Sequence, residues 1–295
     1  MNHYGINLAG NIHYPNGFSN DSVYGAIVSV GPAASIKEHT SGLYARKLAE
    51  EGFITLAYDS SFRGESGGEP RDQENPNVRV EDIRGAVDFL VSLPYVDDNR
   101  IAVLGICAGG GYAATAAMTE RRIKAVGAIA PVNGGRENRA AGQNATISSL
   151  EQIARLRSAE ARGEEWSLSP WMPDEYQNST DIDQREGYDY YSTPRAWHPN
   201  WINQVRSSTM DAVMAFDAFY LAEMLLTQPL QVIVGTKPGS FGSIQDGKSL
   251  YDIAASNDKN IISIENASHF DLYDNSEYVD QAVTRLSTFY RTRLQ

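Results

Sequence analysis

The sequence predicts an α/β fold in which a mostly parallel central sheet carries helices on both faces and an inserted helical cap. Apolar runs of strand length alternate with amphipathic helical segments in the first half of the chain and again near its end. Continuous apolar strands separated by helices are typical of parallel sheets covered on both faces. The alternation lapses between residues 134 and 228, and a glycine-rich turn at residues 105–111 joins an apolar run to a helical segment.

The expected elements follow one another along the chain. Alternating apolar and polar residues at 6–14 predict an antiparallel strand at the edge of the sheet. Longer apolar runs predict buried strands at residues 25–30, 53–58, 101–106, 124–131, 230–234 and 261–265. Apolar positions spaced three and four residues apart predict a helix at residues 81–92, and a clean apolar face predicts a last helix across residues 279–289. Helices are also expected at residues 40–51, in the small-residue run 112–118, in the polar segment 147–162 and in the apolar segment 210–226.

The break in the alternation divides the chain. We expect residues 1–133 and 229–295 to form a catalytic core and residues 134–228 to form a cap. This segment is dense in aromatic residues and contains all four tryptophans: Trp166, Trp171, Tyr176, Tyr188, Tyr190, Tyr191, Trp197 and Trp201. Because pockets are commonly lined by aromatic side chains, we favour a cap. The alternative is a decorated crossover whose aromatic residues form a small satellite core.

Composition excludes several classes of partner and location. The net charge of -12 argues against nucleic acid and against an anionic membrane surface as binding partners. The single cysteine excludes an intramolecular disulfide and is consistent with a reducing compartment. Residues 1–10 have no features of a signal peptide, and no apolar stretch is long enough to span a bilayer. We therefore expect a cytoplasmic protein, and we expect neither a metal nor a cofactor.

The single cysteine, Cys107, lies at the centre of the glycine-rich turn, in the order Gly105-Ile106-Cys107-Ala108-Gly109. A strand, a sharp turn with small flanking residues and a helix are the context of a nucleophile elbow, in which the side chain projects from the end of a strand. We interpret Cys107 as a nucleophile. The alternative is a buried core residue, because free cysteines are often buried.

A cysteine nucleophile needs a base, and His269 is the only histidine that follows the last expected strand. Nucleophile, acid and histidine in that order along the chain are typical of the α/β-hydrolase fold. We therefore expect His269 to be the base. The other four histidines are expected at the surface or at helix ends, with His39 close to the loop at residues 31–35.

Acyl transfer also needs two backbone N–H groups directed at the developing oxyanion. Ala108 follows the nucleophile and begins the expected helix, so its N–H should supply one of them. The loop after residues 25–30 should supply the other, from Ala33 or Ala34, because Pro32 has no N–H.

The orienting acid is assigned by elimination. The loop that follows residues 230–234 begins without a carboxylate, and Asp246 is the first acid on that connection. Asp271 and Asp274, just after His269, are competitors. The alternative for Asp246 is a helix cap before Lys248, a common position for aspartate. We expect Asp246 to hydrogen-bond His269.

Residues of the expected pocket come from two regions. In the aromatic segment, Tyr188, Tyr190 and Tyr191 are candidates for gating or filling the pocket, and Trp197 is a further candidate for its lining. Arg63, in the glycine-rich loop after residues 53–58, is a candidate substrate clamp. The alternative for Arg63 is a local ion pair within that turn.

Several long motifs in this order resemble bacterial and fungal α/β hydrolases related to dienelactone hydrolase. The motifs are residues 37–45, 64–71, 105–112 and 268–273. The fungal members of that group include polyketide transferases, which move an acyl chain from a synthase onto an alcohol, and the loop at residues 235–242 looks more like theirs. The resemblance implies a hydrolase fold and acyl-transfer chemistry. The likeness is weak across the expected cap, and residues 31–34 depart from the His-Pro-Gly-Gly of many relatives.

A thiol at such an elbow favours esters, thioesters or lactones over peptides, because a tetrahedral intermediate formed from an amide expels the thiolate more readily than the amine. We expect a Cys-dependent hydrolase or thioesterase that works through an acyl-cysteine. The alternatives are an acyltransferase that uses an alcohol as acceptor and a catalytically silent binding protein. The partners that fit are a small-molecule acyl substrate, an acyl-carrier or synthase protein, and a second copy of the chain.

Overall fold

A seven-stranded sheet forms the centre of the protein in a computed structural model that describes residues 1–173, 175 and 180–294. Tyr176 of the aromatic segment lies outside the described residues. The strand order is β1-β3-β2-β4-β5-β8-β9. The strands are β1 (Gly10–His13), β2 (Tyr24–Val30), β3 (Ile54–Tyr58), β4 (Val96–Ile106), β5 (Ile123–Ile129), β8 (Leu230–Gly235) and β9 (Lys259–Ile264).

Only β1 runs antiparallel to its neighbour among these strands, and it pairs with β3 at the edge of the sheet. The remaining pairs are parallel. The predicted mostly parallel sheet is therefore confirmed, and so is the antiparallel edge strand. The continuous apolar runs of the central strands account for the parallel sheet, because strands covered on both faces bury nearly every side chain.

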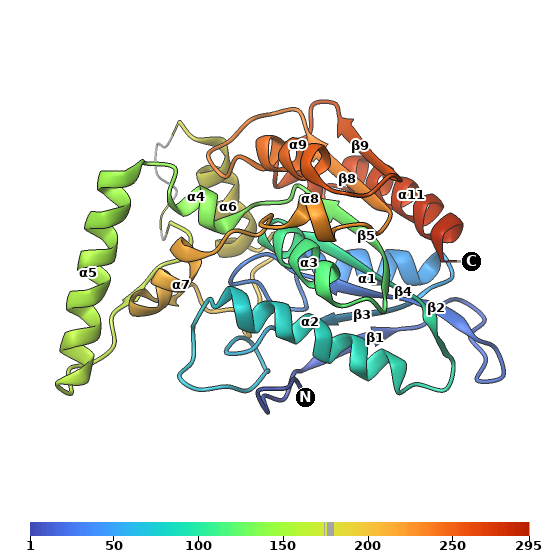
Figure 1. The fold of residues 1–295 in the computed structure, drawn as a ribbon, viewed down its shortest axis with the longest axis horizontal. Coiled ribbons are helices and arrows are strands. Elements are labelled where there is room, and N and C mark those ends of the chain that lie inside the picture. The colour runs from blue at the N-terminus through green and yellow to red at the C-terminus, as the bar shows by residue number, and fades with distance from the viewer. Residues whose placement is uncertain (174, 176–179, 295) are drawn as a thin grey trace.

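Helices cover both faces of the sheet (Figure 1). The α1 helix (Thr40–Glu50) and α11 (Ser276–Arg293) contact each other on one face. On the other face, α2 (Pro76–Val91) contacts α3 (Ala108–Thr119), and α9 (Ser243–Ile253) covers β8. A short helix, α10 (Asp271–Asp274), precedes α11. The prediction that helices cover both faces of the sheet is confirmed.

Residues 134–228, here called the inserted segment, connect β5 to β8. They form α4 (Gly134–Asn138), α5 (Gln143–Ala161), β6 (Leu168–Ser169), α6 (Ile182–Ser192), β7 (Val205–Arg206), η1 (Ser207–Thr209), α7 (Met210–Ala215) and α8 (Ala222–Leu225). In Figure 1, α5 extends away from the rest of the molecule, and only Ile153 of this helix is buried. Within the part of the chain that the structure describes, no helix is both long and apolar enough to cross a membrane.

Two helix predictions differ most from the structure, while α3 and α5 each begin four residues before their predicted start. The α2 helix starts at Pro76, earlier than residue 81, because the Asn75 side chain accepts hydrogen bonds from the first backbone N–H groups. The helix predicted at 210–226 is wrong, since α7 ends at Ala215 and α8 begins only at Ala222. Asp217 breaks it, because its carboxylate accepts from the Asn133 amide and from the Phe219 N–H and so fixes a turn.

Candidate active site

Cys107 occupies the sharp turn between β4 and α3. Its backbone has φ 58° and ψ -129°, in the left-handed half of conformational space that non-glycine residues seldom adopt. A Cβ at Gly105 would overlap the Gly109 carbonyl, and a Cβ at Gly109 would overlap the Val30 carbonyl. The predicted elbow geometry is confirmed, and the flanking glycines are required by this close approach of backbones.

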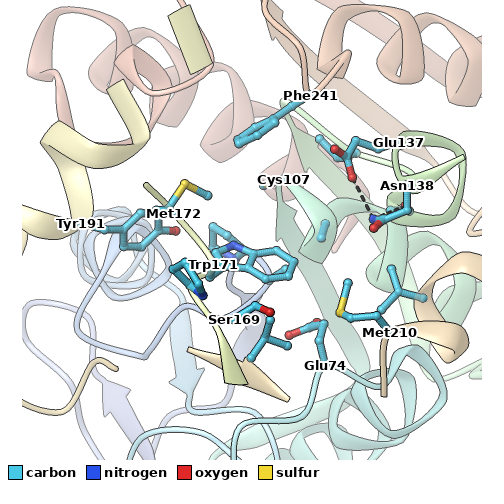
Figure 2. Close-up of a pocket in the computed structure, with 18 of the residues that line it drawn as sticks. Glu74, Cys107, Glu137, Asn138, Ser169, Trp171, Met172, Tyr191, Met210 and Phe241 are labelled. Carbon is cyan, nitrogen blue, oxygen red and sulfur yellow. Dashed lines mark hydrogen bonds between the residues drawn. The ribbon is translucent and has the colours of Figure 1, made fainter. Parts of the chain in front are cut away.

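A cavity of about 360 Å³ opens onto the Cys107 side chain, which is 8 % exposed. Figure 2 shows Trp171, Met172 and Tyr191 on one side of it and Met210 on the other. The described lining residues contain no lysine, arginine or histidine, and most are apolar: Pro32, Ala33, Glu74, Cys107, Ala108, Tyr112, Val132, Gly134, Glu137, Asn138, Ser169, Pro170, Trp171, Met172, Gln184, Tyr191, Val205, Met210, Val213, Met214, Phe241, Phe270 and Tyr273. Such a cavity suits an uncharged apolar group.

Tyr273 connects the thiol to His269. Its hydroxyl lies 3.1 Å from His269 Nε2, and a hydrogen bond between this hydroxyl and the thiol acts on the pKa of Cys107. Tyr273 lines the cavity, whereas His269, 3 % exposed, lies behind it. The structure therefore brings together Cys107 and His269 through a tyrosine that the sequence analysis did not select.

Burial keeps both groups of this pair uncharged. It raises the pKa of the Cys107 thiol to about 12, although hydrogen bonds from Tyr273 and from the Ala108 N–H act in the opposite direction. Burial lowers the pKa of His269 to about 3. At neutral pH the free protein accordingly holds a thiol and a neutral imidazole, and the proton must move when the thiol attacks.

The two alanines of the β2–α1 loop have different environments. Ala33 lines the cavity together with Ala108. The Ala34 N–H instead donates to Glu74 Oε2 at 3.1 Å, and the Ala34 carbonyl accepts from the Trp201 indole. The Ala34 N–H is therefore not free to bind an oxyanion, whereas Ala33 and Ala108 both line the cavity beside Cys107.

The predicted contact between Asp246 and His269 is wrong. One carboxylate oxygen of Asp246 accepts from Arg136 Nε, and the other accepts from the Arg136 guanidinium and the Asn133 N–H, each at 2.7–2.8 Å. These donors hold the carboxylate against α4. His269 Nδ1 is buried without a hydrogen-bond partner among the described residues.

The two competitors for this role also bind elsewhere. The Asp271 carboxylate accepts from the Ser268 N–H at 2.9 Å. Asp274 forms an ion pair with Arg195. Both carboxylates thus stabilise the α10 turn and its contact with the inserted segment.

The predicted pocket residues are only partly brought together. Tyr191 lines the cavity, but Tyr188 is absent from the described lining residues. Trp197 is 58 % exposed, which contradicts its place in the pocket. Arg63 is buried, pairs with Asp72 and donates to the Gln204 carbonyl, so the prediction of a substrate clamp is wrong and the local ion pair is correct.

His39 is buried rather than exposed at the surface. As predicted, it lies at a helix end, directly before α1, where its ring contacts Tyr190, Tyr191 and Trp201 of the inserted segment. Burial lowers its pKa to about 3, helped by the nearby His198. His39 therefore acts as an uncharged ring that joins the β2–α1 loop to the aromatic residues above it.

Sequence reasoning missed most of the lining. Tyr273 follows His269 by four residues, a spacing that places two side chains on one side of a helical turn, and this was a usable signal. Glu74, Trp171, Met172 and Phe241 come from loops whose course the pattern of apolar residues does not fix. Within the described chain, no group of three or more His, Cys, Asp or Glu residues is arranged to hold a metal ion.

Comparison with known proteins identifies relatives over nearly the whole chain. A family model described as "Serine aminopeptidase, S33" matches residues 38–276. "Uncharacterized protein YcjY" of Escherichia coli (strain K12) is 40% identical over 295 residues, which cover 98% of this chain and 95% of that protein. The crystal structure of the hypothetical protein PA2218 from Pseudomonas aeruginosa superposes with a TM-score of 0.90 at 31% identity, covering 99% of this chain and 91% of that chain.

A fungal relative has a named activity. The "Polyketide transferase grgF" of Penicillium sp is 34% identical over 88 residues, 30% of each chain. The crystal structure of alpha/beta hydrolase GrgF from Penicillium sp. sh18 has a TM-score of 0.81 at 19% identity, covering 100% of this chain and 96% of that one. At this identity the structural likeness shows a shared fold.

Proposed function

We propose, from the premise that the chain belongs to the α/β hydrolase family described as serine aminopeptidase S33, that it is a cysteine-dependent enzyme which hydrolyses a thioester, ester or lactone. The observation that carries this proposal is the position of Cys107. Its thiol lies at a nucleophile elbow, faces an apolar cavity and is connected to His269 by one tyrosine hydroxyl. Residue 107 is cysteine in a family described by its serine enzymes.

Acylation begins with attack of Sγ on the substrate carbonyl carbon. The thiol proton passes to the Tyr273 oxygen while the Tyr273 hydroxyl proton passes to His269 Nε2, so that Tyr273 stays neutral. The backbone N–H groups of Ala108 and Ala33 stabilise the oxyanion. The intermediate then collapses: the bond to the leaving group breaks, and this group departs as a thiol or alcohol with the proton from His269.

Deacylation reverses the same proton path. A water attacks the acyl-cysteine, its proton passes to His269, the carbon–sulfur bond breaks and the thiol regains a proton as the carboxylic acid leaves. We favour water because the matching family is one of hydrolases. Transfer to an alcohol is the second candidate, favoured by the similarity to the polyketide transferase grgF.

The cavity indicates the class of acyl group. Charged residues in its lining are acidic: Glu74 accepts from the Tyr112 hydroxyl, and Glu137 accepts from the Asn138 amide. Because no basic residue lines the described cavity, an acyl group that carries its own carboxylate would lose its hydration without gaining a counter-ion. We therefore propose an uncharged, largely apolar acyl group, with peptides disfavoured for the reason given above.

The inserted segment would act as the cap in this scheme. Trp171, Met172 and Tyr191 come from it and cover the cavity above Cys107. Trp201 reaches the oxyanion loop through its hydrogen bond to the Ala34 carbonyl. Movement of this segment would thus change both the access to the thiol and the support of the loop that carries Ala33.

The test is a series of p-nitrophenyl esters and matched thioesters from acetyl to dodecanoyl, assayed with the wild-type protein and with Cys107→Ala. We expect kcat/KM to rise with acyl length until the cavity is filled, and Cys107→Ala to be inactive with an unchanged melting temperature. Turnover retained by Cys107→Ala would refute the thiol mechanism. Added alcohols that yield a new ester instead of the acid would establish transfer.

A further inference from the structure

His269 needs a partner that the residues around it do not yet supply. When His269 Nε2 accepts a hydrogen bond from Tyr273, the ring proton lies on Nδ1, and this buried atom has no partner among the described residues. An imidazole that becomes charged during catalysis is normally oriented by a carboxylate on its other nitrogen. Asp246 binds Arg136 instead, so the orienting carboxylate of His269 would have to come from another residue.

A buried carboxylate from the inserted segment faces this region. Asp183, near the start of α6, is 1 % exposed. Its Oδ2 accepts from the Phe241 N–H at 2.9 Å, while its Oδ1 is buried without a partner in the described chain. Burial raises the pKa of this carboxyl to about 6. A buried acid with one unused oxygen is costly to stability and is a frequent feature of functional sites.

The Asp183 carboxylate occupies the position that a side chain from the β8–α9 loop would otherwise take. A Cβ built on Gly239 would overlap the carboxyl carbon and both oxygens of Asp183. Gly239 lies in the loop directly after β8, where the chain order of this fold places the orienting acid. The Asp183 carboxylate of α6 therefore lies where a carboxylate carried by this loop would lie.

Contacts on both sides of His269 hold α6 in this place. Phe241, whose N–H binds Asp183, also packs against His269, with the two rings perpendicular and their centroids 5.2 Å apart. One turn further along α6, Glu186 accepts a hydrogen bond of 2.5 Å from Ser268. A Cβ built on Gly187 would overlap Met172 Sδ and would lie 3.2 Å from the Phe270 ring. The helix thus contacts the residues before and after His269.

We propose that Asp183 is the positioning residue for His269, with its free Oδ1 accepting the Nδ1 proton when the imidazole becomes charged. Among the described residues each of these atoms lacks a hydrogen-bond partner, so the two are not hydrogen-bonded to each other in the free protein. The pair forms when α6 and the β8–α9 loop settle around a bound acyl group. The inserted segment would then supply a residue of the catalytic site, and His269 would be oriented only when an acyl group occupies the cavity. This inference rests on the proposed function.

Asp183→Asn tests the charge without removing the contact to Phe241, because an asparagine oxygen accepts from the same N–H. Its amide would present a donor to Nδ1 and favour the wrong tautomer, so we expect kcat to fall on the order of 10²–10⁴-fold with little change in KM. Asp181→Asn is the matched control. Asp181 lies two residues away, caps α6 and binds Ser240 of the same loop, and its variant should keep kcat within about threefold of wild type.

Relocation of the carboxylate separates a positioning role from a structural one. Asp183→Gly removes the acid and leaves space beside Gly239, and the D183G/G239D double variant returns a carboxylate to that space from the loop. We expect the double variant to recover at least tenfold in kcat over D183G. A D183N protein with wild-type kcat, or a folded double variant no faster than D183G, would overturn the inference. Failure of the proposed function is distinguishable, because the wild-type protein would then form no acyl-enzyme.

Discussion

The ionisation of Cys107 can be measured without background because it is the only cysteine in the chain. Burial raises the pKa of its thiol from an ordinary value of 9.0 to about 12. Alkylation requires the thiolate, so at pH 7 the reactive fraction should be about a thousandfold smaller than that of an ordinary exposed cysteine. The base His269 does not offset this, since its own pKa is lowered to about 3 by burial.

Iodoacetamide should therefore modify Cys107 with a rate that rises about tenfold for each pH unit and reaches no plateau below about pH 10. The rate is followed by intact-protein mass at fixed reagent concentration. Access through the cavity scales every rate by a similar factor, so the slope against pH is the readout. The chain unfolded in urea is the control and should reach its plateau near the ordinary pKa of cysteine.

Tyr273→Phe extends this test. The hydrogen bond from Tyr273 lowers the pKa of the thiol, so its removal should reduce the alkylation rate further at every pH. A rate that is constant between about pH 6 and pH 8 would refute this reasoning, because a plateau there is the mark of a thiolate paired with an imidazolium. The proton relay proposed above would then be unnecessary.

Three other predictions follow from the contacts around the elbow. Asp246→Asn should cost about 1–3 kcal/mol in the free energy of unfolding, because it breaks the Arg136 pair, while kcat stays near wild type; a large loss of kcat with unchanged stability would restore Asp246 as the orienting acid. Gly109→Ala should destabilise by about 1–3 kcal/mol or more and lower the melting temperature, because the new Cβ meets the Val30 carbonyl; an unchanged melting temperature would contradict the close approach. His39 has a pKa lowered to about 3 in the folded protein, so between about pH 6.5 and pH 3 only the unfolded chain takes up its proton and the free energy of unfolding falls as the pH falls. In urea titrations between about pH 6 and pH 4, His39→Gln should weaken this pH dependence by about 1.4 kcal/mol per pH unit. An unchanged slope would contradict the buried, uncharged state of His39.

The sheet and the elbow were predictable because their signals are local. Strand-length apolar runs such as 101–106 and the glycines around Cys107 act through the nearest backbone, and each strand appears where its run predicts it. The break after Ala215 was not predictable from periodicity, because it depends on the contact of Asp217 with Asn133, 84 residues away along the chain.

The residues around His269 show where order along the chain fails as a guide. Asp246 follows β8 as expected, but a guanidinium from α4 captures its carboxylate. Asp183 and Tyr191 reach the site region from α6, and the sequence does not reveal which turn of that helix faces the core. Long-range placement of short polar helices depends on side-chain packing that a single sequence does not encode in any local pattern.

The proposed reaction depends on a covalent acyl intermediate at Cys107, and this intermediate can be trapped directly. The wild-type protein is mixed with a p-nitrophenyl ester or a thioester of a medium-chain acid, quenched in acid within the first turnovers and weighed intact, and the modified peptide is then mapped. We expect a mass increase equal to one acyl group, located on Cys107 and absent from Cys107→Ala. Turnover without any acylated peptide, or an acyl group on a serine or histidine instead, would contradict it.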